Sequence, residues 1–291
     1  MKYTEQANYL NVFGTNFRLK FFNISTLEAK DLNKRFPIKE CKETIDFKIN
    51  FYNIEDNNSF IDKFNSLADD ENNIVLDQKG FIKSDFATSI YEASEKKVSC
   101  FYRKVGNLSS LVISLVKNTF YFSQGKLNIL FLHSAGISAN DNGYVFIAPS
   151  QGGKSTIASL AEKANLDVLS DELLLIKEDK GDFYLYQFPL EHSFNKNMEF
   201  VVKNRGHKLK NLFFLEKASE INIKNISLVK ALAKAYSQST SFFIDLVPEE
   251  QLQSHRTYVM GFLERLLKKI PHQELSFNKS DPVFEMLGLE N

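Results

Sequence analysis

Short segments of alternating apolar and polar residues dominate the first third of the chain. Between residues 1 and 104, apolar side chains recur at every second position, with Asn, Asp and Gly between the runs. The clearest segments are FRLKFFNI at 17–24, TIDFKINFYNI at 44–54, NIVLDQKGFIKSDF at 73–86 and KVSCFYRKV at 97–105. This pattern is typical of strands that bury one face. We expect residues 1–104 to form a β-rich domain with one or two helices, one of them around 58–68.

From residue 107 the apolar period lengthens to that of a helix. In NLSSLVISLVKNTFYFSQG, residues 107–125, apolar side chains recur three or four positions apart, and Gly125 is expected to end the helix. Beyond the segment discussed next, we expect a helix at 156–164, strands at 166–179, 181–190 and 209–217, helices at 227–238 and 251–270, and a strand at 274–277. This mixture predicts an α/β domain over residues 105–291.

An Asn-Gly pair marks a tight turn in the middle of the chain. We expect one strand from 127 to about 138, a turn at NDNG (140–143) and a second strand at 144–148. The second strand would then be antiparallel to the first. P-loop GTPases and ATPases more often enter their phosphate loop through parallel βαβ units.

The segment APSQGGKST, residues 148–156, follows that second strand and precedes a helix. Its residues are Ala148, Pro149, Ser150, Gln151, Gly152, Gly153, Lys154, Ser155 and Thr156. They match the Walker A pattern except at the first position, where Ala148 replaces Gly. Such a loop directs backbone N–H groups at phosphates, while its lysine reaches the β- and γ-phosphates and its serine reaches Mg²⁺. A serine-capped glycine turn is the structural alternative.

Two carboxylates and a histidine are candidates for chemistry beside this loop. Asp171 and Glu172 lie inside the expected strand 166–179, where acids are costly unless they are paired, hydrated or bound to metal. We expect Asp171 to bind Mg²⁺ or accept a proton; for Glu172 the alternative of a surface-facing acid is equally open. His133 lies on the strand paired with the loop-feeding strand, so a core position and a role beside Asp171 are both open.

Other charged residues and the cysteines carry less functional weight. Arg205, His207, Lys208 and Lys210 form RGHKLK, which we interpret as a solvated face, with a phosphate clamp as the alternative. His192, His255 and His272 have no companions at metal-ligand spacing. Cys41 and Cys100 are too few and too far apart for a metal site or a disulfide framework, so we expect two buried thiols in a reducing compartment.

Charge and hydropathy exclude several classes of partner. The formal net charge is zero, which removes the electrostatic basis for nucleic acid or an anionic membrane surface as the main partner. The most apolar run, LVISLV at 111–116, is too short to span a bilayer, and the first residues have no apolar core like that of a secretory signal. We therefore expect a cytoplasmic globular protein.

The loop, together with its flanking segments, resembles a known catalytic domain. LHSAGISANDNGYVFIAPSQGGKSTIASL followed by LDVLSDELLLI is similar to the C-terminal domain of HPr kinase/phosphorylase and its relatives. That group shares its nucleotide-binding core with the phosphoenolpyruvate carboxykinases. The likeness is close over residues 108–180 and holds only in outline to 291. It implies a P-loop domain with a mixed sheet, entered through an antiparallel strand.

The resemblance also implies roles for individual residues. It makes 148–156 the Walker A loop, matches His133 to the family's histidine ahead of the hairpin, and matches Asp171 to the proton acceptor beside the metal. Glu172 stands where HPr kinases have a second Asp, and Ala148 and Gln151 replace common loop glycines. The glycine-rich signature that accompanies phosphorolysis is missing downstream, so nothing supports HPr as the substrate or the reverse reaction.

These observations predict a kinase that uses ATP and Mg²⁺, with GTP left open. Lys154 would neutralise the β- and γ-phosphates, Ser155 and an acid (Asp171 or Glu172) would hold the metal, and Asp171 aided by His133 would accept the proton. The acceptor would be a Ser or Thr of a peptide or small protein, which residues 1–104 would help to recognise. The alternatives are a nucleotide-binding module without turnover and a small-molecule phosphotransferase. Homo-oligomer formation stays open.

Overall fold

The computed structural model describes residues 3–36, 44–54, 79–84, 87–92, 95–102, 108–188, 205–240 and 249–289. It divides into two compact units, one ending at Phe122 and the other beginning at Ser123. The fold is α/β with mixed sheets, as the sequence predicts. No helix in the described ranges is both long and apolar enough to cross a membrane. The helix expected at 58–68 lies outside the described residues.

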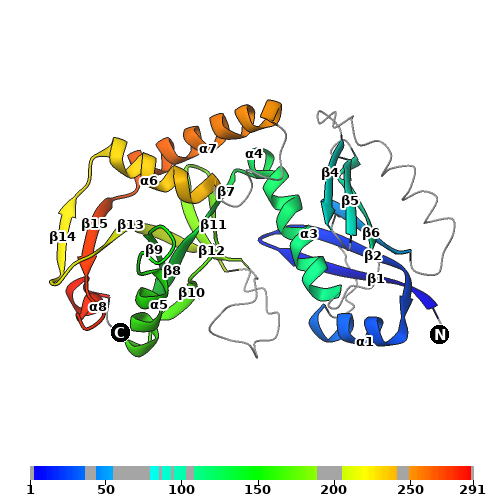
Figure 1. Cartoon of the computed structure of the whole chain (residues 1–291), viewed down its shortest axis with the longest axis horizontal. Helices are drawn as coiled ribbons and strands as arrows, with labels where there is room; N and C mark the ends of the chain where they lie inside the picture. The colour runs from blue at the N-terminus through cyan, green and yellow to red at the C-terminus, as the bar shows by residue number, and fades with distance from the viewer. Residues whose placement is uncertain are drawn as a thin grey trace. The chain divides into compact units, whose positions relative to one another are not determined.

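The first unit is built on a six-stranded sheet in the order β1-β2-β3-β6-β5-β4 (Figure 1). Its strands are β1 (Tyr3–Val12), β2 (Thr15–Ser25), β3 (Phe47–Asn53), β4 (Lys79–Ser84), β5 (Ala87–Glu92) and β6 (Lys97–Tyr102). Helix α1 (Thr26–Arg35) begins at a capping box, in which the Ser25 side chain accepts from the Glu28 amide and the Glu28 side chain accepts from the Ser25 amide. Alternating phenylalanines, such as Phe17 and Phe21, fill the buried face of the sheet.

Helix α3 (Leu108–Phe122) belongs to this first unit, whereas the sequence placed the division at residue 104. The physical reason is its packing, because Phe120 contacts Phe13 and Phe17 with ring centroids 5.8 and 5.3 Å apart. The helix ends at Phe122. Gly125 does not end it, but lies in the short helix α4 (Gln124–Leu127).

The second unit contains a nine-stranded mixed sheet in the order β10-β8-β9-β13-β12-β11-β7; in addition, β15 pairs with β13, and β14 pairs with β15. Its strands are β7 (Ile129–Leu132), β8 (Ser134–Ala139), β9 (Asn142–Ile147), β10 (Asp167–Ser170), β11 (Leu174–Asp179), β12 (Asp182–Gln187), β13 (His207–Lys217), β14 (Asn222–Asn225) and β15 (His272–Phe277). Its longer helices are α5 (Lys154–Lys163), α6 (Leu228–Thr240) and α7 (Glu249–Lys269), and a short α8 (Val283–Met286) follows. The sequence patterns did not predict β14 or α8.

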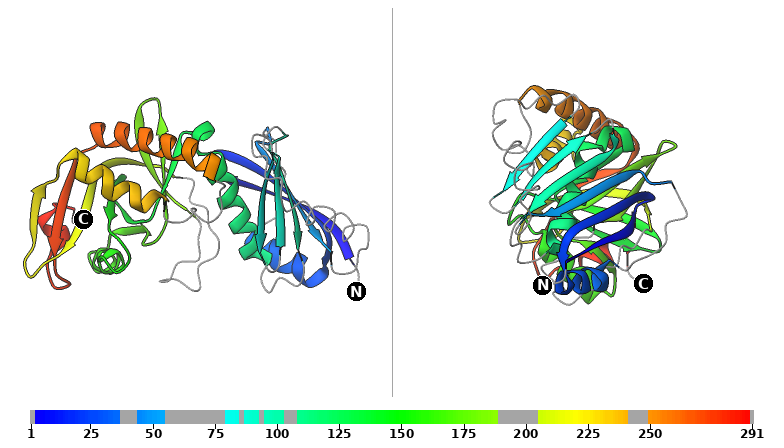
Figure 2. Two further views of the ribbon diagram at one scale, coloured as in Figure 1. Left: turned by 45° about the horizontal axis from the view of Figure 1, so that its top comes forward. Right: turned by 90° about the vertical axis from the view of Figure 1, so that its right-hand side faces the viewer.

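Helices cover both faces of this sheet (Figures 1 and 2). Helices α6 and α7 pack on the side chains of Val145, Ile147, Leu212 and Phe214, while α5 and α8 pack on Phe146 and the opposite face. Because successive side chains of a strand point to opposite faces, β9 and β13 contribute to both cores. Residues 145–147 of β9 and 212–215 of β13 are therefore continuous apolar runs.

The hairpin predicted ahead of the loop is present. Strands β8 and β9 pair antiparallel, with Ala139 opposite Asn142 at the turn. On its other side β9 pairs parallel with β13, which places Phe214 opposite Ile147. The 148–156 loop therefore leaves the sheet where β13 also ends.

Candidate phosphate-binding site

The 148–156 loop turns back sharply between β9 and α5. The Gly152 amide donates to the Pro149 carbonyl over 3.0 Å, and Gln151 and Gly153 take φ values of +61° and +104°. The left-handed region costs a residue with a side chain about 1–2 kcal/mol, whereas glycine adopts it freely. Gly153 is also the N-cap of α5, so the loop passes directly in front of the amides of that helix.

Gly152 satisfies a steric condition of the same turn. A Cβ atom there would lie 2.6 Å from the Ala148 Cβ and 2.9 Å from the Pro149 carbonyl oxygen. No larger residue fits without opening the turn. The two glycines in the sequence pattern therefore have separate roles: one allows close approach and the other allows the backbone angle.

Lys154 is the first residue of α5, and its side chain folds back over the loop. Its Nζ donates to the Ala148 carbonyl over 2.8 Å and to the Pro149 carbonyl over 3.0 Å, and the residue is 7% exposed. Burial lowers the pKa of this ammonium, while the charges of Asp171 and Glu172 act in the opposite direction. The Lys154 ammonium therefore lies at the start of the loop, beside the carbonyls of Ala148 and Pro149.

Asp171 and Glu172 lie in a bend between two strands, and not within one strand as the sequence suggested. Ser170, the last residue of β10, accepts hydrogen bonds from the amides of Glu172 and Leu173, each over 3.1 Å. This serine turn stops the strand and directs the chain out of the sheet. Asp171 is 7% exposed, whereas Glu172 is exposed, so the expectation based on opposite strand faces does not apply.

His133 marks a matching break in the neighbouring chain segment, which was expected to be one strand from 127 to 138. Strand β7 pairs with β11 as far as Leu132 opposite Leu174, and β10 pairs with β8 from Gly136 opposite Ser170. The two interruptions therefore lie opposite each other in the sheet, which brings His133 beside Asp171. The His133 amide donates instead to the Gln238 carbonyl of α6, over 3.0 Å.

The imidazole of His133 is uncharged at neutral pH. Its pKa is lowered from 6.5 to about 4, chiefly by burial and next by the positive charge of Lys154, while Asp171 acts to raise it. His133 can therefore accept or share a proton, but it does not add positive charge beside the loop.

These groups surround a cavity of about 470 Å³, here called the first cavity. Its lining residues are His133, Ser150, Gln151, Gly153, Lys154, Ser155, Thr156, Asp171, Glu172 and Lys217. The predicted catalytic and metal-binding residues therefore converge. Lys217, at the end of β13, was not predicted to line the site. The sequence shows it only as a lysine after an apolar run, and that run does not reveal the parallel pairing of β13 with β9 that places Lys217 beside the loop.

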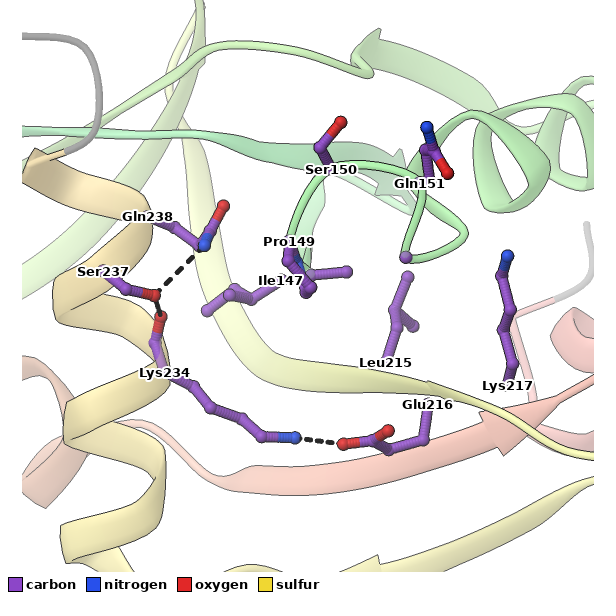
Figure 3. Close-up of a pocket in the computed structure, with 12 residues that line it drawn as sticks. Ile147, Pro149, Ser150, Gln151, Leu215, Glu216, Lys217, Lys234, Ser237 and Gln238 are labelled. Carbon is purple, nitrogen blue, oxygen red and sulfur yellow. Dashed lines mark hydrogen bonds and ion pairs between the residues drawn. The ribbon is translucent and has the colours of Figure 1, made fainter.

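A second cavity of about 530 Å³ lies against the beginning of the loop (Figure 3). Its lining residues are Ile147, Ala148, Pro149, Ser150, Gln151, Gly152, Leu215, Glu216, Lys217, Lys234, Ser237 and Gln238. Three loop residues expected to bind phosphate, Ala148, Pro149 and Gly152, line this cavity and not the first. The sequence patterns gave no indication of the α6 residues.

Comparison with known proteins identifies the family. A family model described as SynChlorMet cassette protein ScmC matches residues 98–285, well over half of the chain. The chain belongs to this family. No curated protein is similar enough to the chain to count as a match. The ScmC match includes every residue that lines the two cavities, and the resemblance to HPr kinase/phosphorylase stays a prediction beside it.

The RGHKLK segment of this ScmC family member lies away from both cavities. It opens β13, where Lys208 is opposite Asn142 at the start of β9, and the loop lies beyond the far end of both strands. Arg205 pairs with Asp141, and Lys208 pairs with Asp182 over 3.0 Å. The interpretation as a solvated face is correct for Arg205, Lys208 and Lys210 and wrong for His207, which is buried, and the geometry does not agree with a phosphate clamp at this loop.

Among the described residues, His207, His255, His272 and Cys100 do not line either cavity. His207 is buried and its Nδ1 lies 2.8 Å from the Ser138 hydroxyl oxygen, while burial lowers the pKa of His255 on α7 to about 4. Cys100 is a buried free thiol whose pKa burial raises to about 12. Cys41 and His192 lie outside the described residues.

Proposed function

We propose that the chain is a kinase that transfers the γ-phosphoryl group of ATP to a hydroxyl group, with GTP as the alternative donor. The observation that carries the proposal is the first cavity, where one space adjoins the N-terminus of α5, the Lys154 ammonium and the nearly buried Asp171. Backbone amides and a cation suit a polyphosphate, and a carboxylate nearby suits deprotonation of an acceptor. If the loop were only a serine-capped structural turn, it would need neither a cavity beside it nor a buried carboxylate facing that cavity.

The proposed reaction follows from the positions of these groups. Lys154 exchanges its two loop carbonyls for β- and γ-phosphate oxygens, which the α5 amides also bind. The acceptor oxygen forms a bond to the γ-phosphorus while the bond from that phosphorus to the bridging oxygen of ADP breaks. The hydroxyl proton passes to Asp171, and neutral His133 orients that carboxylate or shares the proton.

The residues of the first cavity fit magnesium. Mg²⁺ prefers oxygen ligands and usually takes only one or two from the protein, with phosphates and water completing its shell. The Ser155 hydroxyl and the Asp171 carboxylate are such donors, and Glu172 is a further one. Across the described ranges no three His, Cys, Asp or Glu side chains cluster as a metal cage would require. When bound, the ion supplies neutralisation of phosphate charge.

The acceptor we propose is a Ser or Thr of a peptide or small protein, in the cytoplasm. The buried free thiol of Cys100 suits a reducing compartment. The zero net charge gives no electrostatic basis for nucleic acid or a membrane surface as partner.

Incubation with γ-labelled ATP, Mg²⁺ and a mixture of short Ser- and Thr-containing peptides tests this function. Asp171→Asn keeps the volume of the side chain and removes the base, so we expect label transfer to fall by about 10²-fold or more while the protein stays folded. Asp167→Asn is the matched control, since Asp167 is an exposed acid on the adjacent strand. Tight ATP binding without transfer would favour a nucleotide-binding module, and absence of ATP binding would refute both functions.

A further inference from the structure

The two cavities meet at the tip of the 148–156 loop. Both are lined by Ser150, Gln151 and Lys217, and each then extends along a different set of residues. The first continues to the start of α5 and the acids, and the second continues to Leu215 and the C-terminal part of α6. A ligand group bound at this shared boundary would face both spaces.

The orientation of the loop indicates which end of a bound nucleotide lies at the boundary. In Walker A loops the lysine reaches the β- and γ-phosphates. Here its Nζ lies on the carbonyls of Ala148 and Pro149, which line the second cavity, whereas Ser155 and Thr156 line only the first. Because Lys154 itself also lines only the first cavity, the terminal phosphate is expected in the first cavity at its boundary with the second, where Lys217 lies.

The second cavity itself is close to electrically neutral. Ile147, Pro149 and Leu215 supply apolar surface, and Ser237 and Gln238 supply a hydroxyl and an amide on α6 (Figure 3). The ammonium of Lys234 is already paired with Glu216 and lies 3.7 Å from Glu274. Among the described lining residues, this leaves Lys217 as the cation without an ion pair, at the boundary where the phosphate would be.

We propose that the second cavity binds the phosphoryl acceptor, as an uncharged peptide segment with an apolar residue next to the reactive Ser or Thr. This inference rests on the proposed kinase function. The apolar wall would take the neighbouring side chain, and Ser237 and Gln238 would pair with peptide N–H and C=O groups. An anionic acceptor such as a sugar phosphate would find no second unpaired cation among these residues.

A hydrogen bond connects this second cavity to the residues proposed for proton transfer. The carbonyl of Gln238 accepts from the His133 amide over 3.0 Å, so the α6 wall is held directly beside His133 and Asp171. A hydroxyl that projects from the second cavity across the loop tip therefore reaches the carboxylate side of the terminal phosphate.

Filling the second cavity tests the assignment. Ser237 is exposed on α6. Its hydroxyl donates to the Lys234 carbonyl over 2.9 Å and accepts from the side-chain amide of Gln238 over 3.1 Å, both on the same helix, so Ser237→Phe should fold normally. Val229→Phe is the matched control, because Val229 is 78% exposed on the same helix, two turns away. The affinity for a non-hydrolysable ATP analogue with Mg²⁺ is measured by calorimetry, and transfer from γ-labelled ATP is measured on a positional library of short peptides with a central Ser or Thr.

We expect Ser237→Phe to keep its affinity for the analogue and to lose about 10²-fold in transfer, the scale of an ångström-sized misplacement, with Val229→Phe unchanged. The preferred peptides should carry an apolar residue beside the acceptor. Loss of analogue affinity in Ser237→Phe would assign the cavity to the nucleotide and overturn the inference. Unchanged transfer, a required acidic neighbour, or no transfer to any peptide would overturn it too. Failure of the wild-type protein to bind the analogue would instead refute the kinase function.

Discussion

Replacing Lys154 by Met should raise the pKa of His133, and replacing Asp171 by Asn should lower it. The two charges act on the imidazole in opposite directions, and burial acts together with Lys154 to favour the neutral ring. The fall from 6.5 to about 4 corresponds to roughly 3 kcal/mol against the charged form. Burial is the largest cause, so removing the lysine charge should restore only the smaller part, and the pKa in Lys154→Met should stay below 6.5.

The imidazole C2–H resonances, followed by NMR as the pH is lowered from neutral, measure this directly. His133→Gln assigns the signal. His255 is an internal control, since its pKa is also about 4, but burial alone is responsible and its signal should not move in either variant. Lys163→Met provides the matched charge control, because Lys163 is exposed at the other end of α5.

Two results would refute the electrostatic reasoning. A wild-type His133 that titrates near 6.5 would mean that the ring is not buried between the two strand breaks. Shifts of the same sign in Lys154→Met and Asp171→Asn would mean that the lysine and the aspartate do not both face it. Either result would also remove the basis for a neutral proton-sharing histidine in the proposed reaction.

Three further substitutions test the loop and the sheet that support the cavities. Gly153→Ala places a side chain at φ +104° and 3.1 Å from the Phe277 ring, so calorimetry should show weaker binding of the ATP analogue in a protein that still unfolds cooperatively. Gly136→Ala would place a Cβ 2.5 Å from the buried Leu174, and urea unfolding should show a loss of about 1–3 kcal/mol with an unchanged slope. Glu274 is buried against Lys224 and Lys230, whose ammonium groups lower its pKa from 4.5 to about 2, and it lies 3.7 Å from the Lys234 ammonium. Its stabilisation should be full above pH 4.5 and be lost as the pH falls toward 2, so Glu274→Gln should cost about 2 kcal/mol at neutral pH. Equal acid sensitivity of wild type and variant would contradict this.

The sequence by itself determined the parts of this protein that depend on local chemistry. The NDNG segment predicts the β8–β9 hairpin, but the two residues that take positive φ at the turn are Asn140 and Asp141, while Asn142 and Gly143 belong to β9. The 148–156 loop and the start of α5 also follow from local chemistry, since Gly152 and Gly153 permit what other residues do not. Alternating and helical apolar patterns likewise gave the fold class and most elements.

Only the tertiary structure decided which distant residues meet at the cavities. The breaks at His133 and Asp171 arise where one segment changes strand partners, which its continuous apolar pattern does not reveal. Lys217 and Gln238 reach the loop through the parallel pairing of β13 with β9 and the packing of α6 on the same sheet. Strand partners and helix packing follow from burial summed over the whole core, so no short window of sequence contains them.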